Sequence, residues 1–487
     1  MERTSRLFIP AAIVDQSISG GKDWKPNSAK LIFLNSEKSE FYCQPVSKED
    51  EGWKDSKSAG WWTIITLKPL SVTPVKLTIT DEISTQSEIN ASLFRISNGI
   101  THLELSETTG AFVDLRVENL NNGSNLLEGI TSNLTNGFID DDKKFPAWNL
   151  TPEYWNFPLD LPNDTGVEIE VVDSGPIFTS IQINRILGKD IVIQKITLFK
   201  TLPEIYLEYI ADWNQPNTML KILYSTATKS EIATTDGAYA IVNFKTNPET
   251  PCDKARYEKI CHKFVDLSSP DKSWGIALIN EGKYAFDVNG GNIQLTLLRS
   301  CRYTPPSPEA WVNMERNLNQ EEFNHDVPEF SELGPFRCNY VLYPHSGSTL
   351  TNPDDTANPM IRRKAEGFNN PIIIIPVEGI NETENRSLLK GGSLLVISPS
   401  NISLGALKYE EWKNDNSIII RFFEGCGRSV PVEVKVHAKI AKMIFKIEEI
   451  DLLERSLNQD PKWNKEKGIL SFKMDKFEIR SFKIRLN

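Results

Sequence analysis

The stretch VEIEVVDSGPIFTSIQINRIL (167–187) decides the fold. Apolar and polar residues alternate along it, the pattern breaks at 173–176, and the alternation then resumes. Successive side chains of a strand point to opposite faces, so this pattern predicts two strands around a turn, each with one buried face. Strands of this kind are typical of antiparallel sheets.

The same period of two recurs along the chain. It is found in IVIQKITLF (191–199), EIYLEYIADW (204–213), PVEVKVHAKI (431–440) and FEIRSFKIRL (477–486). Helical stripes are scarce, and EEIDLLERSL (448–457) fits a short helix or a strand followed by a turn equally well. The sequence therefore predicts an all-β protein built of long sandwiches.

A length of 487 residues suggests several domains. We predict a small β domain over 1–85, a large antiparallel sandwich over 86–350 and a C-terminal β-sandwich over 351–487. The insertion at 302–335 is rich in Pro and Glu and lacks a strand pattern. Loops of that length in compact domains are usually functional or mobile.

A second informative stretch is WGIALINEGKYAFDVNGGNIQLTLLRS (274–300), which places charged residues and glycines between apolar runs. It could form a catalytic loop or part of a sheet. We interpret it as a strand at 275–279, a turn at 280–282 and a return through Tyr284 and Phe286. A second turn at 289–291 then leads into a buried strand at 293–298.

Composition excludes several classes of function. The formal net charge of −11 disfavours a nucleic-acid partner or an anionic membrane surface. The longest apolar run, PIIIIPV (371–377), is strand-sized, so we expect no membrane insertion. Six cysteines lie far apart without a C-x-x-C pair, which argues against a disulfide scaffold. The N-terminus lacks a clear A-x-A site, so we expect a cytoplasmic location, with secretion or a vacuolar location left open.

Local signals for chemistry are weak. No two of the five histidines are spaced i, i+4, so no local zinc site is predicted. Cys261 and His262 are adjacent, and adjacent strand side chains point to opposite faces, which prevents a nucleophile–base pair. We interpret IDDDKK (139–144) as a solvated turn. The aromatic segment FPAWNLTPEYWNF (145–157) could stack on sugars if exposed, but we favour rings that plug a domain interface.

The segment 253–300 resembles the C-terminal half of the α-mannosidases of glycoside hydrolase family 38. That family's A-R-F-E stretch, H-x-W-x-D-L stretch, G-V-A-L-L-N-D-x-K-Y-G hairpin and L-x-L-L-R-S strand are matched at 255–258, 262–267, 275–284 and 295–300. Similar segments are AWNLTPEY (147–154), DWNQPNTMLKI (212–222) and YVLYPHSG (340–347). Matches in the same order extend from about residue 95 to the end of the chain.

The resemblance implies an all-β fold: a large galactose-mutarotase-like super-sandwich with smaller β-sandwich domains on either side. In such α-mannosidases a β/α barrel supplies an aspartate nucleophile, an aspartate acid/base and most ligands of a zinc ion. The zinc motif of that barrel, of the type H-x-D-x-x-W, has no counterpart in this sequence. We therefore assign no catalytic residue, no metal ligand and no cofactor to this chain, and we expect zinc in a partner barrel.

Three hypotheses follow from the resemblance. In the first, the chain is the β-domain portion of an α-mannosidase, a non-catalytic subunit or split half that needs a separate zinc-binding catalytic barrel for retaining hydrolysis of terminal α-mannosides in glycans. The expected partners are that barrel and α-mannoside glycans, with self-association left open. The candidates for the rim of the cleft are Arg256, Lys283, Tyr284 and Arg302, although for each of them we favour the simpler interpretation as a solvated sheet residue.

The second hypothesis is a stand-alone carbohydrate-binding or structural module that has lost the enzyme activity. The third is catalysis by the large sandwich itself. Galactose mutarotases use a histidine acid and a glutamate base, and only His262 and His345 lie in suitable segments of this sequence.

Overall fold

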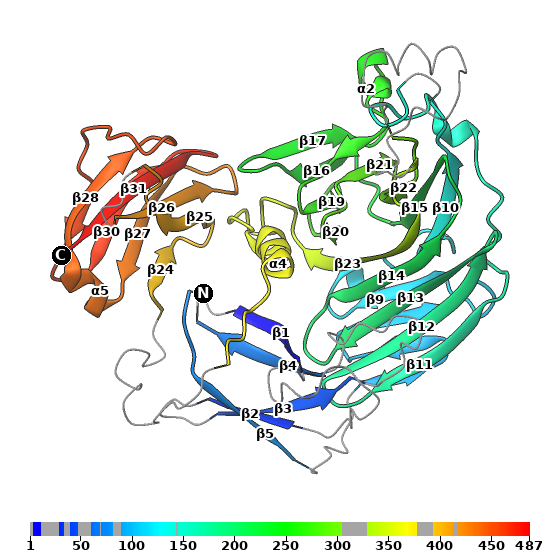
Figure 1. Cartoon of the computed structure of the whole chain (residues 1–487), viewed down its shortest axis with the longest axis horizontal. Coiled ribbons are helices and arrows are strands. Elements are labelled where there is room, and N and C mark those ends of the chain that lie inside the picture. The colour runs from blue at the N-terminus through cyan, green and yellow to red at the C-terminus, as the bar shows by residue number, and fades with distance from the viewer. Residues whose placement is uncertain are drawn as a thin grey trace.

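The computed structural model describes residues 3–10, 29–33, 39–46, 60–68, 70–80, 89–142, 145–303, 329–376, 393–412 and 417–487. Antiparallel strands dominate these residues, which confirms the all-β prediction. In Figure 1 a large sandwich and a C-terminal sandwich lie on opposite sides of the helix α4 (Met360–Asn369), and the first sheet lies below that helix. The large sandwich thus has a smaller β unit on either side, as predicted.

Two sheets form the layers of the large sandwich. The nine-stranded sheet has, in spatial order, β11 (Glu168–Ser174), β12 (Phe178–Leu187), β13 (Asp190–Phe199), β14 (Ile205–Trp213), β23 (Gly334–Ser346), β20 (Trp274–Asn280), β19 (Phe264–Ser268), β16 (Ile232–Asp236) and β17 (Ile241–Lys245). The five-stranded sheet has β10 (Leu134–Ile139), β15 (Thr218–Ser225), β22 (Asn292–Arg299), β21 (Ala285–Asn289) and β18 (Lys259–Ile260). A further sheet of β6 (Asn90–Ser92), β7 (Arg95–Ser97), β8 (Thr101–Leu105) and β9 (Phe112–Val117) contributes to the same core.

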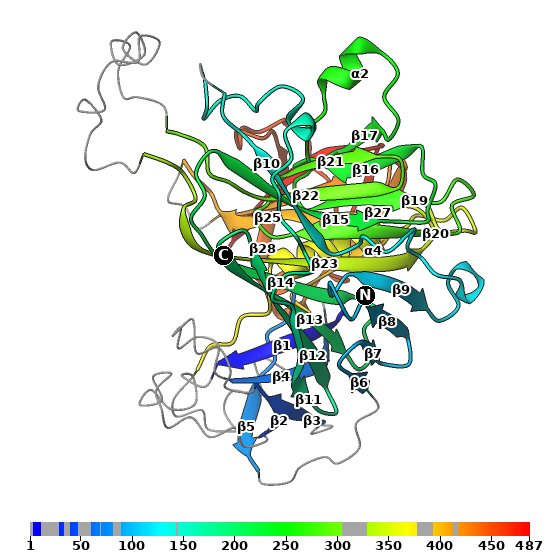
Figure 2. The same ribbon diagram turned by 90° about the vertical axis from the view of Figure 1, so that its right-hand side faces the viewer.

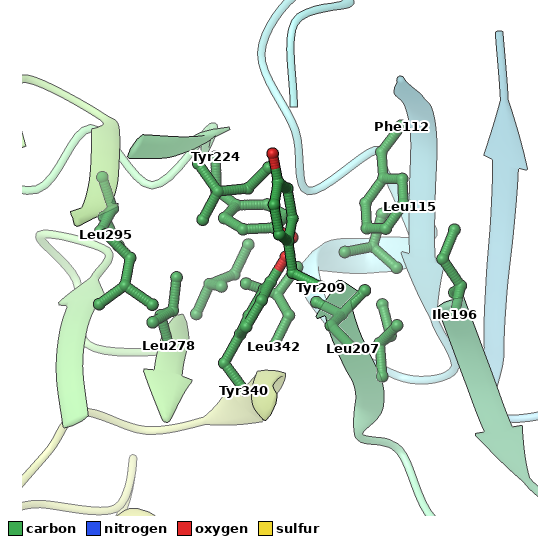
Figure 3. Packing of buried hydrophobic residues seen from close by; sticks show 14 of the residues in the cluster. Phe112, Leu115, Ile196, Leu207, Tyr209, Tyr224, Leu278, Leu295, Tyr340 and Leu342 are labelled. Atoms are coloured by element: carbon green, nitrogen blue, oxygen red, sulfur yellow. The ribbon is translucent and has the colours of Figure 1, made fainter. Parts of the chain in front are cut away.

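The main core fills the space between these sheets. Figure 3 shows Leu207 and Leu342 of the nine-stranded sheet packed with Leu295 of the five-stranded sheet and Phe112 of β9. Burial of such apolar side chains is the dominant favourable term in folding. The same core contains tyrosines whose hydroxyls have polar partners, and Tyr224 donates to Asn133 Oδ1 at 3.0 Å.

The stretch 167–187 forms the antiparallel pair β11 and β12, with Glu168 opposite Asn184, as its alternation predicts. The stretch 274–300 differs from the prediction at its first turn. β20 pairs with β19 and β23, whereas β21 pairs with β18 and β22. The chain therefore crosses from one sheet to the other at 281–284 instead of returning along β20. The second turn is a hairpin, in which Asn289 lies opposite Asn292.

Two four-stranded sheets form the C-terminal sandwich. One contains β24 (Leu395–Ser398), β27 (Val430–Val436), β30 (Ile469–Met474) and β29 (Lys462–Asn464), and the other contains β25 (Ile402–Tyr409), β26 (Ile418–Glu424), β31 (Ile479–Leu486) and β28 (Ile444–Ile450). The segment 448–457 is the end of β28 followed by turns, so the strand alternative was correct there. The short helix α5 (Ala438–Met443) precedes β28.

The first sheet contains β1 (Arg3–Pro10), β4 (Gly60–Leu67), β3 (Glu40–Pro45), β2 (Ala29–Phe33) and β5 (Val75–Ile79). Its core also receives Ile372 and Ile374, while the alternate residues Ile373 and Ile375 are exposed. The apolar run at 371–376 thus covers the first sheet without becoming a strand.

Sequence reasoning missed α4. Ile361 and Ala365 of this helix are buried against Phe264 and Ile279 of the nine-stranded sheet. The described residues of 351–376 therefore pack on the first two β units, and Arg363 also donates to the Ser400 carbonyl of the C-terminal sandwich at 2.8 Å. The division at 350/351 stays a prediction.

Candidate functional site

The outer face of the five-stranded sheet, which is turned away from the main core, carries a buried ion cluster. Leu220 and Ile222 of β15 point into the core, so Lys221 between them points outward, where its side chain is nevertheless 0% exposed. Lys221 Nζ lies 2.5 Å from Glu258 Oε2 and 2.9 Å from Asp287 Oδ2. Burial lowers the pKa of the Lys221 ammonium, but its attraction to both carboxylates outweighs burial and leaves the pKa above its ordinary value.

Tyr154 covers this ion cluster and shields it from solvent. It lies in the 3-10 turn η2 (Tyr154–Asn156), within the segment 145–158, which we call the cover segment. The Tyr154 hydroxyl donates to Asp287 Oδ2 at 2.8 Å and accepts from Lys221 Nζ at 3.0 Å. Burial, with the nearby carboxylates, raises the pKa of Tyr154 far above its ordinary value, so the phenol stays neutral.

Two neighbouring carboxylates raise the question of glycoside hydrolysis. In a retaining glycosidase the two carboxyl groups flank a bound sugar about 5–5.5 Å apart. Glu258 and Asp287 instead share one buried ammonium, and Tyr154, only 2% exposed, covers them. The cluster is therefore closed to a sugar, and its effect is to fasten the cover segment to the sheet.

Arg299, at the end of β22, is a second fastening point, and we call its contacts with the cover segment and Asp140 the Arg299 clamp. Its guanidinium pairs with Asp140 and donates to the backbone carbonyls of Pro146, at 2.7 Å, and Asn149. Asp140 is 1% exposed. The interpretation of 139–144 as a solvated turn is therefore wrong for Asp140, whose charge is compensated by Arg299.

The cover segment presents several aromatic rings to solvent. Trp148, Trp155 and Phe157 are 72%, 45% and 48% exposed. The Trp155 ring packs edge-on against Tyr257, with 5.2 Å between ring centroids. We call the exposed rings of Trp148, Trp155 and Phe157, together with the half-buried ring of Tyr257, the aromatic face. The segment 145–157 contains five aromatic rings that we expected to be buried at a domain interface. Tyr154 alone of these is fully buried, and Phe145 is partly exposed.

The structure brings two of the four rim candidates to the base of the insertion. Lys283 Nζ lies 3.2 Å from Glu332 Oε1, and Arg302 Nη2 lies 3.4 Å from Glu329 Oε1. Glu332 also accepts a hydrogen bond from the backbone N–H of Arg299 at 2.7 Å. This bond connects the ends of the described insertion to the Arg299 clamp. Residues 304–328 of the insertion lie outside the described residues.

The other two candidates lie apart from these ion pairs. Tyr284 is exposed on the crossing between the two sheets, with its ring 6.1 Å from that of His262. Arg256 is exposed at the end of the short helix α2 (Pro251–Ala255). Figure 2 shows α2 at the top of the large sandwich, above β17 and β21.

The two histidines considered for catalysis have different surroundings. His345 is buried, and its Nε2 lies 2.8 Å from Asp266 Oδ1, which is itself inaccessible. Thr349 donates to the other oxygen of that carboxylate, so the group holds the chain after β23 in place. His262 follows β18 at a bend. Neither histidine forms a hydrogen bond or ion pair with a glutamate in the described part of the chain.

Sequence reasoning missed the ion cluster and the Arg299 clamp, although every member lies in or beside a segment already singled out. Lys221 is the one charged residue of the run MLKIL, and Glu258 ends the segment 255–258. A lysine inside an apolar strand signals a buried partner. Within the described ranges no group of three or more His, Cys, Asp or Glu side chains could hold a metal ion, and no helix is long and apolar enough to span a membrane.

Two family models match the chain. The glycosyl hydrolases family 38 C-terminal domain matches residues 96–309, and the family 38 C-terminal beta sandwich domain matches residues 401–482. The first match contains the ion cluster, the cover segment and the Arg299 clamp.

Curated relatives are α-mannosidases. An α-mannosidase of Saccharomyces cerevisiae is 25% identical over 288 residues, which is 56% of this chain and 23% of that protein. Alpha-mannosidase 2C1 of Mus musculus is 23% identical over 335 residues, which is 69% of this chain and 28% of that protein. The chain thus spans less than a third of either relative.

Two solved structures share the fold. An α-mannosidase from Enterococcus faecalis V583 aligns with a TM-score of 0.61 at 14% identity, over 99% of this chain and 54% of that chain. A second family 38 protein of Enterococcus faecalis aligns with a TM-score of 0.63 at 15% identity, over 99% of this chain and 56% of that chain.

Proposed function

Since this chain belongs to glycosyl hydrolase family 38, of which it carries the C-terminal β domains, we propose that it is the non-catalytic β portion of an α-mannosidase and that a separate catalytic barrel docks on it. The observation that carries this proposal is the aromatic face. Its rings are held outward by a segment that is fastened at Lys221 and at Arg299. Exposed aromatic residues on a rigid support are typical anchors of protein interfaces.

The reaction itself is assigned to the barrel. The resemblance implies retaining hydrolysis of terminal α-mannosides through a glycosyl-enzyme intermediate, with zinc bound in the barrel. The described residues of this chain offer no ligand set for that ion. In this proposal the β domains contribute a docking surface and part of the cleft's rim.

The rim candidates have suitable positions for this role. Lys283 and Arg302 flank the insertion, and each already has a glutamate partner, Glu332 and Glu329. Paired charges of this kind can hold the ends of a loop beside a cleft. Arg256 and Tyr284 are exposed and available to a glycan or to the barrel.

The binding of the barrel tests this proposal. We would measure the Kd between the purified chain and a family 38 catalytic barrel from the same genome by isothermal titration calorimetry. The double variant Trp148→Ala/Trp155→Ala should weaken binding by at least about 10-fold, since interface tryptophans commonly contribute 2 kcal/mol or more. Trp412→Ala is the matched control, because Trp412 is also exposed but lies on the C-terminal sandwich.

The second candidate is a stand-alone carbohydrate-binding module. The strong exposure of Trp148 favours it as well, because exposed rings stack on sugar faces. Oligomannose binding by the chain alone, lost in the same double variant and accompanied by no affinity for the barrel, would support this candidate against the first.

A further inference from the structure

A cavity of about 310 Å³ lies between the first sheet and the outer face of the nine-stranded sheet. The aromatic face lies on the five-stranded sheet, which is the opposite layer of the large sandwich. β1 and β4 contribute Arg6 and Trp62, and the nine-stranded sheet contributes Lys195, Glu208 and Arg337. Small-molecule pockets typically measure about 300–1,000 Å³, so this cavity has room for one small ligand.

Among the charged side chains that line the cavity, Arg6 differs from Lys195 and Arg337 in forming no direct ion pair with a described residue. Lys195 Nζ lies 2.8 Å from Asp173 Oδ2, and the Arg337 guanidinium pairs with Glu208. Arg6 forms no ion pair or hydrogen bond with any residue that the structure describes. Glu281, Glu204 and Glu208 attract the Arg6 charge from beyond ion-pair distance, but none of them accepts a hydrogen bond from its guanidinium.

Aromatic rings surround the Arg6 guanidinium. Its Cζ lies 3.9 Å from the ring centroid of Tyr206 and 4.8 Å from that of Trp62, and the rings of Phe199 and Phe368 lie within 6 Å. These rings hold the side chain by cation–π attraction but leave its N–H donors without acceptors. Burial lowers the pKa of Arg6, although a guanidinium stays protonated at neutral pH.

We propose that this cavity binds a monosaccharide-sized sugar acid, with the ligand's carboxylate on Arg6. A carboxylate carries one negative charge and matches the planar fork of a guanidinium, whereas a phosphate monoester carries between one and a half and two charges at neutral pH. Thr197 and Asn339 line the same cavity and offer a hydroxyl and an amide group to sugar hydroxyls, and the buried Ser180 hydroxyl bonds to that of Thr197 at 2.8 Å. The half-buried Trp62 offers flat apolar surface to the sugar ring.

Calorimetric titration of the full chain tests this site. The probes are glucuronate, galacturonate and mannuronate, compared with mannose and mannose 6-phosphate. At least one uronate should bind 10-fold or more tightly than mannose and mannose 6-phosphate. Arg6→Gln should weaken uronate binding by about 10- to 100-fold, because it removes a charge-assisted hydrogen bond.

Two further variants keep the test decisive. Thr197→Phe fills the cavity from the opposite wall without changing Arg6, and it should also abolish uronate binding. Arg116→Gln is the control, since Arg116 is exposed and paired with Asp114 at 2.8 Å, and it should bind like the natural chain. The proposal is overturned if no uronate binds, if mannose 6-phosphate binds most tightly, or if binding survives both Arg6→Gln and Thr197→Phe. None of these results depends on a barrel.

Discussion

Replacement of Lys221 by methionine should strongly destabilise the large sandwich. Methionine keeps most of the apolar stem but removes the ammonium, which leaves Glu258 and Asp287 without the charge that lies 2.5 and 2.9 Å from them. Removal of one partner from a buried ion pair typically costs about 3–5 kcal/mol. We expect a loss in that range in the free energy of unfolding of this domain at pH 7.

Hydrogen exchange followed by mass spectrometry measures this loss where it occurs, because peptides from β15 and β22 report the unfolding of the large sandwich alone. Lys408→Met is the matched control. Lys408 also contacts two carboxylates, Glu411 and Glu454, but it is 38% exposed and should contribute about 1 kcal/mol or less. If Lys221→Met costs no more than Lys408→Met, the cluster does not fasten the sheet as we infer.

The effect of Lys221→Met on the free energy of unfolding should change with pH in one direction. The folded-state pKa of Lys221 is raised, so its stabilisation is complete below the unfolded pKa of about 10.4 and is lost as pH rises through the folded value. The difference between the natural chain and Lys221→Met should therefore be constant near neutral pH and shrink above about pH 10. Gly291→Ala should destabilise by about 1–3 kcal/mol in thermal unfolding, because its Cβ would lie 2.3 Å from the Thr226 carbonyl oxygen. Gly290→Asn should cost less, because the Cβ at that position would lie 4.0 Å from Asn247 Oδ1 and Asn tolerates the φ of +55°. Ile361→Ala should cost about 2–5 kcal/mol and remove exchange protection from α4, while Met360→Ala on the exposed side should cost far less. At pH 8 a disulfide reagent should modify Cys252 rapidly, because Cys252 is exposed and the other five cysteines are buried. Burial also raises the pKa of Cys43, Cys338 and Cys426 to about 12. The variant Cys252→Ser should abolish the rapid phase of modification.

The strands could be predicted from the sequence because alternation is a local property. The pairs β11–β12 and β21–β22 follow from their own residues and turns. The crossing at 281–284 could not be predicted, because a period of two gives a strand's faces but not the sheet it joins. All seven residues of β20 are buried, which fits a central strand, whereas β21 alternates.

Other features escaped prediction for different physical reasons. α4 has 10 residues and an apolar stripe of only Ile361, Ala365 and Phe368, which is too short to stand out from its charged neighbours. The contact of Lys221 with Glu258 joins residues 37 positions apart, and only the pairing of the strands brings them together. The aromatic segment was recognised, but which ring is buried depends on the hydroxyl of Tyr154 reaching the cluster.

The division of labour between the β domains and the catalytic barrel is tested most directly by a reconstitution assay. Hydrolysis of a chromogenic α-mannoside is measured with the chain alone, the family 38 barrel alone, and the two together with zinc. We predict no hydrolysis by the chain alone and the highest activity from the mixture, reduced by Trp148→Ala/Trp155→Ala. Hydrolysis by the purified chain alone, or a barrel whose activity is unaffected by the chain, would contradict the proposed function.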